Sequence, residues 1–233
     1  YLPIKMDIEP TTGCNFRCTM CEVSQPGYIK KNMNLDTFEK IIQQNKQLIK
    51  IRLQGLGEPF VNTNFIKMIK IAEKYHIKVD FVTNGSLLNE TNIKKLISLN
   101  NLNIMYVSID GSSSNVFEKI RVGSNFNQII KNLKNFSEIN SLNNKKIKSK
   151  VMMLVQKLNY SEIEEVIKLS KFLGFEGIDF QVKLTGFGNK KLEKNNSLQQ
   201  VNTIGSENIL NILNKFEKKY ASKNFVFNII KNN

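Results

Sequence analysis

The stretch CNFRCTMC, residues 14–21, contains all three cysteines of this 233-residue chain. They are Cys14, Cys18 and Cys21, which gives a C-x3-C-x2-C spacing. A cubane iron-sulfur cluster usually takes four thiolate ligands, so three thiolates would leave one iron open to a ligand that the protein does not supply. The motif therefore predicts an iron-sulfur site with one iron at which chemistry can take place.

Three other interpretations of these cysteines are weaker. A disulfide framework cannot use all three thiols, and the chain has no further cysteine. A structural zinc ion would need a fourth ligand, for which the chain offers a single histidine, His76. A buried helical stripe would also space cysteines by three and four residues. However, residues 11–13 (TTG) and 25–27 (QPG) frame the motif as a loop, so we expect a metal-binding loop.

The length suits one sizeable domain, or one domain with an extension. No apolar run approaches the length of a membrane span and no signal peptide is visible, so we expect no membrane partner and a cytoplasmic location, where thiols stay reduced. The sequence begins with Tyr1 rather than Met, and we therefore expect it to be an excerpt of a longer protein.

The chain carries 34 Lys and Arg residues against 20 Asp and Glu residues, a formal net charge of +14. Such a charge would ordinarily indicate a nucleic-acid or anionic-membrane partner. Here the lysines are scattered over every helical segment, and no RNA-binding signature or ladder of aromatic and basic residues appears. A solvated basic surface is therefore favoured over a nucleic-acid interface.

Strand patterns and helical patterns alternate six times along the chain. The predicted strands cover residues 4–9, 49–54, 77–82, 103–109, 147–155 and 177–182, and the helical segments lie at 35–48, 65–72, 89–98, within 112–140 and at 160–173. Asn34 and Asn159 are suited to cap the first and last of these helices, and Gly174 is suited to end the last one. Six alternations favour parallel strands joined by right-handed crossovers.

Several strands have one polar face, which narrows the choice of architecture. The polar positions are Asp7, Glu9, Arg52, Gln54, Asp80, Ser108, Asp110, Asp179 and Gln181. A closed eight-stranded barrel fills its interior with packed aliphatic layers, whereas parallel strands buried on both faces are apolar throughout. We therefore predict an α/β fold in the form of a partial, wider barrel with a polar interior. A sheet with one solvated face remains the alternative.

The candidate ligand-binding segments all follow strands. The cysteine loop follows the first strand, residues 55–59 (GLGEP) follow the second, residues 83–85 (TNG) the third, and Asp110-Gly111 the fourth. Active sites of barrels and open parallel sheets form at the carboxyl ends of strands. His76 precedes the third strand, at the opposite edge, so we expect a surface or helix-end histidine rather than a metal ligand.

With these motifs in this order, the chain resembles the radical S-adenosylmethionine (SAM) superfamily over residues 1–188. The resemblance implies a partial (β/α)6 TIM-like barrel with a short C-terminal extension. Residues 189–233 are expected to form a linker, a C-terminal helix and a short strand at residues 225–227 (FVF), with a further domain beyond Asn233 left open. The resemblance also implies that Cys14, Cys18 and Cys21 bind a 4Fe-4S cluster, and that SAM chelates the fourth iron. Reductive cleavage of SAM then gives a 5'-deoxyadenosyl radical that abstracts a hydrogen from the substrate, an oxidoreductase type of chemistry.

The resemblance also assigns SAM-binding roles. Gly57 and Glu58 resemble the pair that holds the SAM ammonium, Met20 occupies the position next to the adenine, and Thr83 and Ser108 resemble residues that face SAM or substrate. Gln181 would approach the adenosine, and Arg121 would meet the SAM carboxylate. The structural alternatives are ordinary turns for Gly57-Glu58 and Ser108, a core-filling methionine, and a surface cation at a helix end for Arg121. No catalytic acid or base can be named from the sequence.

The subfamily signal lies in residues 113–136 and in the run VSIDG, residues 107–111. Both resemble members that carry a C-terminal SPASM domain with auxiliary clusters and that modify peptides, proteins or smaller metabolites. A reductant protein such as ferredoxin or flavodoxin is the implied partner. Two alternatives of other classes remain: a nucleic-acid-binding module braced by zinc or a cluster, and a simple iron-sulfur electron carrier.

Overall fold

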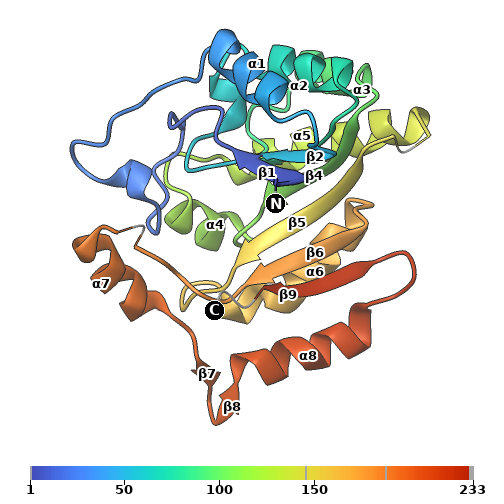
Figure 1. The fold of residues 1–233 in the computed structure, drawn as a ribbon. Helices are drawn as coiled ribbons and strands as arrows, with labels where there is room; N and C mark the ends of the chain where they lie inside the picture. The colour runs from blue at the N-terminus through green and yellow to red at the C-terminus, as the bar shows by residue number, and fades with distance from the viewer. Residues whose placement is uncertain (1, 145, 187, 231–233) are drawn as a thin grey trace. The chain divides into compact units, whose positions relative to one another are not determined.

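The computed structural model describes residues 2–144, 146–186 and 188–230. Strands and helices alternate along the chain (Figure 1). The strands of the larger sheet are β1 (Lys5–Ile8), β2 (Lys50–Leu53), β3 (Lys78–Thr83), β4 (Leu102–Ser108), β5 (Lys148–Leu154), β6 (Gly177–Gln181) and β9 (Val226–Ile230). Their order is β1-β2-β3-β4-β5-β6-β9. The six predicted strands are thus present, and a seventh follows from the C-terminal region.

Helices connect these strands. They are α1 (Leu35–Gln44), α2 (Phe65–Lys74), α3 (Glu90–Ile97), α4 (Ser114–Ile120), α5 (Phe126–Leu142), α6 (Ile163–Phe172), α7 (Lys190–Gln199) and α8 (Ile209–Tyr220). A small hairpin, β7 (Thr203–Ile204) with β8 (Glu207–Asn208), lies between α7 and α8. Within the described part of the chain, no helix combines the length and apolar character needed to cross a membrane.

The chain divides into two compact units. The first contains the described residues within Tyr1–Asn15, Pro26–Tyr106 and Gln128–Lys148, and the second those within Phe16–Gln25, Val107–Asn127 and Ser149–Asn233. The boundary between Asn15 and Phe16 falls inside the cysteine loop. Cys14 therefore belongs to the first unit, and Cys18 and Cys21 belong to the second.

The first unit is organised around β1, β2 and β3, which pair in parallel. Its core contains an edge-to-face aromatic cluster, in which the ring of Phe65 lies 4.9 Å from that of Phe60 and 5.5 Å from that of Phe81. One residue of the polar face predicted for these strands, Asp80, is paired inside the unit. Asp80 is fully buried. Its carboxylate forms an ion pair with Lys50 at 2.5 Å and accepts a hydrogen bond of 2.7 Å from Asn103.

The second unit is organised around β5, β6 and β9, which are also parallel. The ring of Phe180 on β6 packs 5.0 Å from that of Phe227 on β9, so the C-terminal strand shares the core. Helix α8 runs beside β9 (Figure 1). Hydrogen bonds from Lys219 and Tyr220 on α8 lower the pKa of Glu164 on α6 below its usual value. This exposed contact stabilises the fold above the usual carboxylate pKa and is lost as the pH falls through the lowered value.

The helix ends test the capping predictions. Asn34 caps α1 by accepting a hydrogen bond of 2.7 Å from the backbone N–H of Thr37, as predicted. The predicted Asn159 cap is wrong: Asn159 precedes a short helical turn, Tyr160–Glu162, that leads into α6, but its side chain accepts no capping hydrogen bond there. The Asn159 amide instead donates to the carbonyl oxygens of Asp110 and Leu154, at 3.0 and 2.9 Å, and so ties the loop after β4 to the end of β5.

Two helices end in the same backbone motif with different residues. Gly174, with φ of 71°, ends α6 as predicted, and the next N–H, of Phe175, reaches back to the carbonyl of Ser170 at 3.1 Å. His76 occupies the equivalent position after α2 with φ of 57°, and the N–H of Ile77 reaches the carbonyl of Ala72 at 3.0 Å. His76 is exposed, which confirms the expected helix-end histidine.

We expect His76→Gly to raise the free energy of unfolding by about 0.5–1 kcal/mol. A left-handed backbone costs about 1–2 kcal/mol for residues other than glycine, so the substitution removes this strain. Part of the gain is offset because glycine loses more conformational entropy on folding. Urea denaturation measures the change, and His76→Ala, which keeps the strain, is the matched control. A stability loss in His76→Gly with a parallel loss of bound iron would contradict the helix-end role.

Candidate functional site

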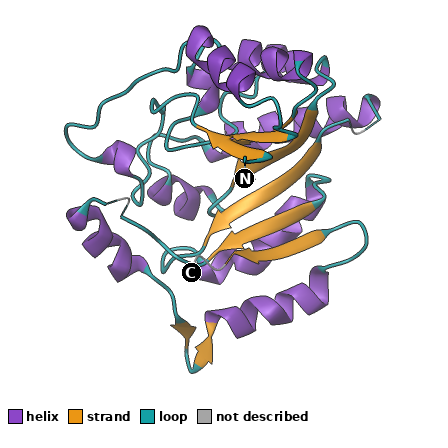
Figure 2. Cartoon of the chain, in the orientation of Figure 1, coloured by secondary structure: helices purple, strands orange, loops and turns teal. Residues whose placement is uncertain are grey.

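The cysteines lie on the long loop between β1 and α1, which Figure 2 draws in teal and which is interrupted by one short helical turn, Glu22–Ser24. All three are thiols rather than disulfide partners. Among the described residues, no three Cys, His, Asp or Glu side chains gather closely enough to hold a single metal ion. In an iron-sulfur cluster the irons and sulfides stand between the protein thiolates, so the thiolates of a cluster do not all contact one ion.

In the first unit, Gly57 touches the backbone of the cysteine loop. A Cβ atom on Gly57 would overlap the carbonyl oxygens of Thr11 and Gly13. The next residue fixes the same approach, because the N–H of Glu58 donates to the carbonyl of Gly13 at 2.9 Å. Only glycine therefore allows the loop after β2 to lie against the residues that lead into Cys14.

The carboxylate of Glu58 is the next feature of the first unit. Its side chain is only 2 % exposed, and it accepts hydrogen bonds of 2.8 Å from Oγ1 of Thr83 and 2.6 Å from the N–H of Asn84. Such donors orient the carboxylate, and its oxygens can accept further hydrogen bonds from a cationic ligand. The structure thus brings together Gly57, Glu58 and Thr83, which the sequence predicted separately.

A polar network in the first unit was not predicted from the sequence. Asn15, next to Cys14, donates to Oγ of Ser86 at 2.9 Å and accepts from the Asn84 amide at 3.0 Å. Asn132 on α5 donates to the carbonyls of Gly85 and Ser86, both at 3.0 Å. These bonds fix the loop after β3 and attach the beginning of the cysteine motif to it.

In the second unit, Cys18 is fixed by its neighbours on both sides. The N–H of Arg17 donates to the carbonyl of Val122 at 2.8 Å, and the N–H of Thr19 donates to that of Ile120 at 2.9 Å. Oγ of Ser24 also donates to the carbonyl of Cys18. The cysteine loop is therefore joined to the end of α4, where Arg121 lies.

Asp110 and Arg121 form a buried ion pair in the same unit. Asp110 is 0 % exposed, and its Oδ2 atom accepts from Nε and Nη2 of Arg121 at 2.8 and 2.7 Å. The other oxygen, Oδ1, accepts from the N–H of Leu154 at 2.8 Å. The remaining guanidinium nitrogen, Nη1, lies 4.0 Å from Sγ of Cys18. The Arg121 side chain is only 11 % exposed, so the alternative of a surface cation is wrong.

The other predicted residues of the second unit are Met20, Ser108 and Gln181. Met20 is buried, and its carbonyl accepts a hydrogen bond of 3.0 Å from Asn196 on α7. Ser108 and Gln181 are the last residues of β4 and β6, and both are partly exposed. Gln156, beyond the end of β5, was not predicted. It is fully buried, and its side-chain amide has no hydrogen-bond partner in the described part of the chain.

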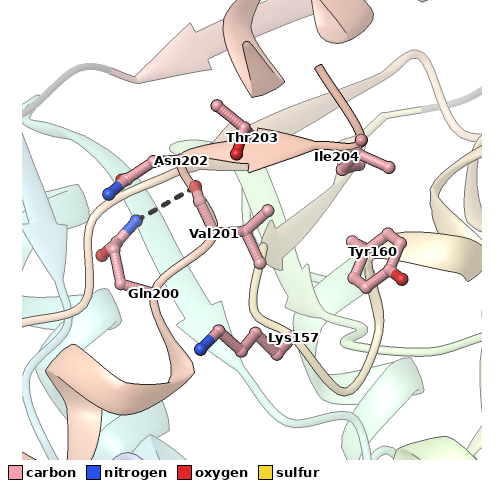
Figure 3. Close-up of a pocket in the computed structure, with 8 residues that line it drawn as sticks. Lys157, Tyr160, Gln200, Val201, Asn202, Thr203 and Ile204 are labelled. Atoms are coloured by element: carbon pink, nitrogen blue, oxygen red, sulfur yellow. Dashed lines mark hydrogen bonds between the residues drawn. The ribbon is translucent and has the colours of Figure 1, made fainter. Parts of the chain in front are cut away.

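A cavity of about 390 Å³ lies in the second unit and contains none of the predicted residues. Figure 3 shows its wall, with β7 on one side and Lys157 and Tyr160 on the other. The lining residues are Lys157, Tyr160, Gln200, Val201, Asn202, Thr203, Ile204 and Gly205. Among these described residues there is one cation and no acidic side chain. The cavity therefore suits polar or anionic groups.

These features fit the cofactors expected from the sequence. Thiolates are the ligands that iron-sulfur clusters take. The Gly57 contact and the buried Glu58 carboxylate provide a close backbone and an anion for an ammonium group. An orphaned buried amide such as Gln156, at the edge where ligands bind parallel sheets, is also what a site for a polar cofactor would contain.

Comparison with known proteins points the same way. The sequence model of the family described as "Radical SAM superfamily" matches residues 8–170. A tungsten-containing aldehyde ferredoxin oxidoreductase cofactor-modifying protein from Pyrococcus furiosus is 28% identical over 178 residues, which cover 73% of this chain and 49% of that protein. The mycofactocin maturase MftC from Mycolicibacterium smegmatis is 24% identical over 174 residues, or 74% of this chain and 43% of the relative. The chain thus spans less than half the length of both relatives.

Solved structures show the same fold. SuiB from Streptococcus suis bound to S-adenosylmethionine superposes with a TM-score of 0.77 at 18% identity, over 99% of this chain and 51% of that one. SuiB bound to its precursor peptide SuiA superposes with a TM-score of 0.69 at 16% identity, over 97% and 49% of the two chains. The likeness confirms the predicted α/β fold of a partial TIM-like barrel. The family match does not favour the nucleic-acid module or the simple electron carrier.

Proposed function

Because this chain belongs to the radical SAM superfamily, we propose that it is the catalytic core of an enzyme that modifies a peptide by radical chemistry. The chain is that of an enzyme, and the cofactors of its family are a 4Fe-4S cluster and SAM. The observation that carries the proposal is the loop with Cys14, Cys18 and Cys21 at the carboxyl end of β1. When bound, the two cofactors would supply the reductive cleavage of SAM and the radical that abstracts a substrate hydrogen.

Cys14, Cys18 and Cys21 would bind three irons of the cluster. Gly57 and Glu58 would hold the SAM ammonium group, since the glycine admits close backbone approach and the buried carboxylate is already oriented by Thr83. Thr83 would act indirectly, because its hydroxyl group keeps the Glu58 carboxylate in this orientation. These roles are supported by the local geometry of the first unit and by the family resemblance of the motifs.

Glu58→Gln is expected to weaken SAM binding by about tenfold. The amide removes the negative charge, and hydrogen bonds to a charged group are worth about 1.5–3 kcal/mol. Equilibrium dialysis with labelled SAM on the reconstituted protein measures the affinity. Thr63→Ala, on the same connection between β2 and α2 but exposed, is the control. Unchanged SAM affinity in Glu58→Gln would exclude the ammonium-binding role.

In the second unit, Ser108 and Gln181 would contact SAM from the ends of β4 and β6, and Met20 would pack against its adenine. Gln156 is added to this set because its buried amide lacks a partner among the described residues. We take residues 1–188 as the core and residues 189–233 as its extension, whose strand β9 pairs with β6. A ferredoxin or flavodoxin in the cytoplasm would supply the electron.

A peptide substrate is supported by the relatives. One is named a maturase, and SuiB has been solved with its precursor peptide. The chain covers about half of each of these proteins, so the substrate of the whole protein is part of the proposal. The cavity beside Lys157 offers a cation to an acidic or carboxy-terminal group of such a peptide.

Two measurements test this function. Anaerobic reconstitution with iron, sulfide, reductant and SAM should release 5'-deoxyadenosine and methionine, and no release from a protein with an intact cluster would contradict the enzyme. The low-molecular-mass fraction of a cell extract should then stimulate the release. Prior protease digestion of that fraction should abolish the stimulation if the substrate is a peptide, and persistent stimulation would instead indicate a small metabolite.

A further inference from the structure

The surroundings of Cys18 indicate a role for Arg121 other than binding the SAM carboxylate. We propose that Arg121, held by Asp110, donates a hydrogen bond to the sulfur of Cys18 and thereby raises the reduction potential of the cluster. The inference rests on the proposed function, because it requires Cys18 to be a cluster ligand. It assigns Arg121 as a residue that tunes the cluster rather than as a catalytic residue.

The first argument is that the guanidinium cannot easily turn away from the sulfur. Two of its nitrogens, Nε and Nη2, donate to the same oxygen of Asp110 at 2.8 and 2.7 Å. Asp110 is itself fixed, because its other oxygen accepts from the N–H of Leu154 at 2.8 Å and it is fully buried. A planar guanidinium held at two points has one orientation, and in that orientation Nη1 lies 4.0 Å from Sγ of Cys18.

The second argument is that the backbone holds Cys18 at this distance. Arg17 and Thr19, its two neighbours, donate to the carbonyls of Val122 and Ile120. These carbonyls flank Arg121 in sequence just as the donors flank Cys18. The two short segments therefore run side by side, and the thiol and the guanidinium are set by the same pair of hydrogen bonds.

The physical consequence follows from the sign of the charge. Reduction adds an electron to the cluster, so a nearby positive charge and an N–H donor to a ligand sulfur favour the reduced state. The Arg121 side chain is 11 % exposed and Asp110 is 0 % exposed. Water therefore screens the interaction less than it would at the surface. Asp110 offsets part of the charge, but it accepts from Nε and Nη2, whereas the nitrogen next to Sγ of Cys18 is Nη1.

The test measures the midpoint potential of the reconstituted full chain without SAM, by a redox titration followed by electron paramagnetic resonance. Arg121→Gln should make one-electron reduction about tenfold less favourable, a shift of about 59 mV to more negative potential. Arg121→Lys keeps a charge for Asp110 but loses the fork geometry, so a smaller shift in the same direction is expected. Arg17→Gln removes an exposed charge next to Cys18 and should leave the potential unchanged.

The outcomes separate the two roles of Arg121. Unchanged potentials in both Arg121 variants, with SAM affinity lowered in equilibrium dialysis, would overturn the inference in favour of the SAM carboxylate. An equal shift in Arg17→Gln would overturn it as a non-specific charge effect. If Arg121→Gln does not fold because Asp110 is left unpaired, the lysine variant decides. A wild-type chain that takes up no four-iron cluster would overturn the proposed function itself, and iron analysis shows this before any potential is measured.

Discussion

Alanine in place of any one of Cys14, Cys18 or Cys21 should lower 5'-deoxyadenosine release from the reconstituted protein by more than about 100-fold. Loss of residues that only support metal ligands already costs about 10–100-fold, and loss of a ligand removes a bond to iron itself. The chain has no fourth cysteine that could replace the missing thiolate. Iron and sulfide content, visible absorption and chromatographic measurement of 5'-deoxyadenosine check the prediction together.

The matched control is Thr19→Ala, which changes an exposed side chain between Cys18 and Cys21. The contact of residue 19 with α4 uses its backbone N–H, so the substitution leaves that bond in place. The control should keep its iron and its activity. Full iron content and normal SAM cleavage in any of the three cysteine variants would show that the thiol is not a ligand. Zinc without iron in the wild-type protein would favour the structural-metal alternative.

The order of strands and helices could be predicted because burial produces a periodic spacing of apolar residues in the sequence. Predictions of helix ends from the same spacing were less accurate. The apolar pattern predicted a helix to residue 48, but α1 ends at Gln44, where the Asn45 amide donates to the carbonyl of Ile41 at 2.8 Å. Leu48 is buried outside the helix. Apolar spacing thus reports burial, and it cannot say whether the buried residue is still helical.

The seventh strand, β9, could be predicted only in part for a related reason. Residues 225–227 (FVF) indicated a short strand, but not that β9 would pair with β6 and continue to Ile230. Its partner β6 lies more than forty residues earlier, and a helix, a hairpin and a second helix separate the two strands. Pairing over such a separation is decided by the packing of Phe227 against Phe180, which local sequence does not encode.

Within the candidate site, the sequence identified residues that form a distinctive motif, and it did not identify polar residues of a type that is common in this chain. Three cysteines in eight residues and a Gly-Glu-Pro turn are distinctive. Asn15 and Asn132 gave no signal, because asparagine is abundant throughout this chain and its polar contacts depend on partners distant in sequence. Arg121 was found by resemblance, but its partners were not. Asp110 and Cys18 lie 11 and 103 residues away from it, and only the fold places them at the same guanidinium.

Gly57→Ala should reduce SAM cleavage by about 100-fold while the protein still folds. The added methyl group would overlap the carbonyl oxygens of Thr11 and Gly13, and backbone atoms cannot move aside as a flexible side chain can. The loop after β2 and the loop that leads to Cys14 must therefore separate, and a displacement of about 1 Å can cost about 100-fold in rate. Overpacking of this kind destabilises by about 1–3 kcal/mol, which urea denaturation measures.

Gly27→Ala separates this effect from backbone strain. Gly27 lies on the cysteine loop with φ of 79°, and a Cβ there would meet nothing within 4 Å. The alanine should cost about 1–2 kcal/mol of stability for its left-handed backbone and leave SAM cleavage near the wild-type rate. Equal losses of activity in the two variants would trace the effect to general destabilisation. A selective loss in Gly57→Ala, with iron content retained, would place the defect in the approach of the two loops, where Glu58 is oriented.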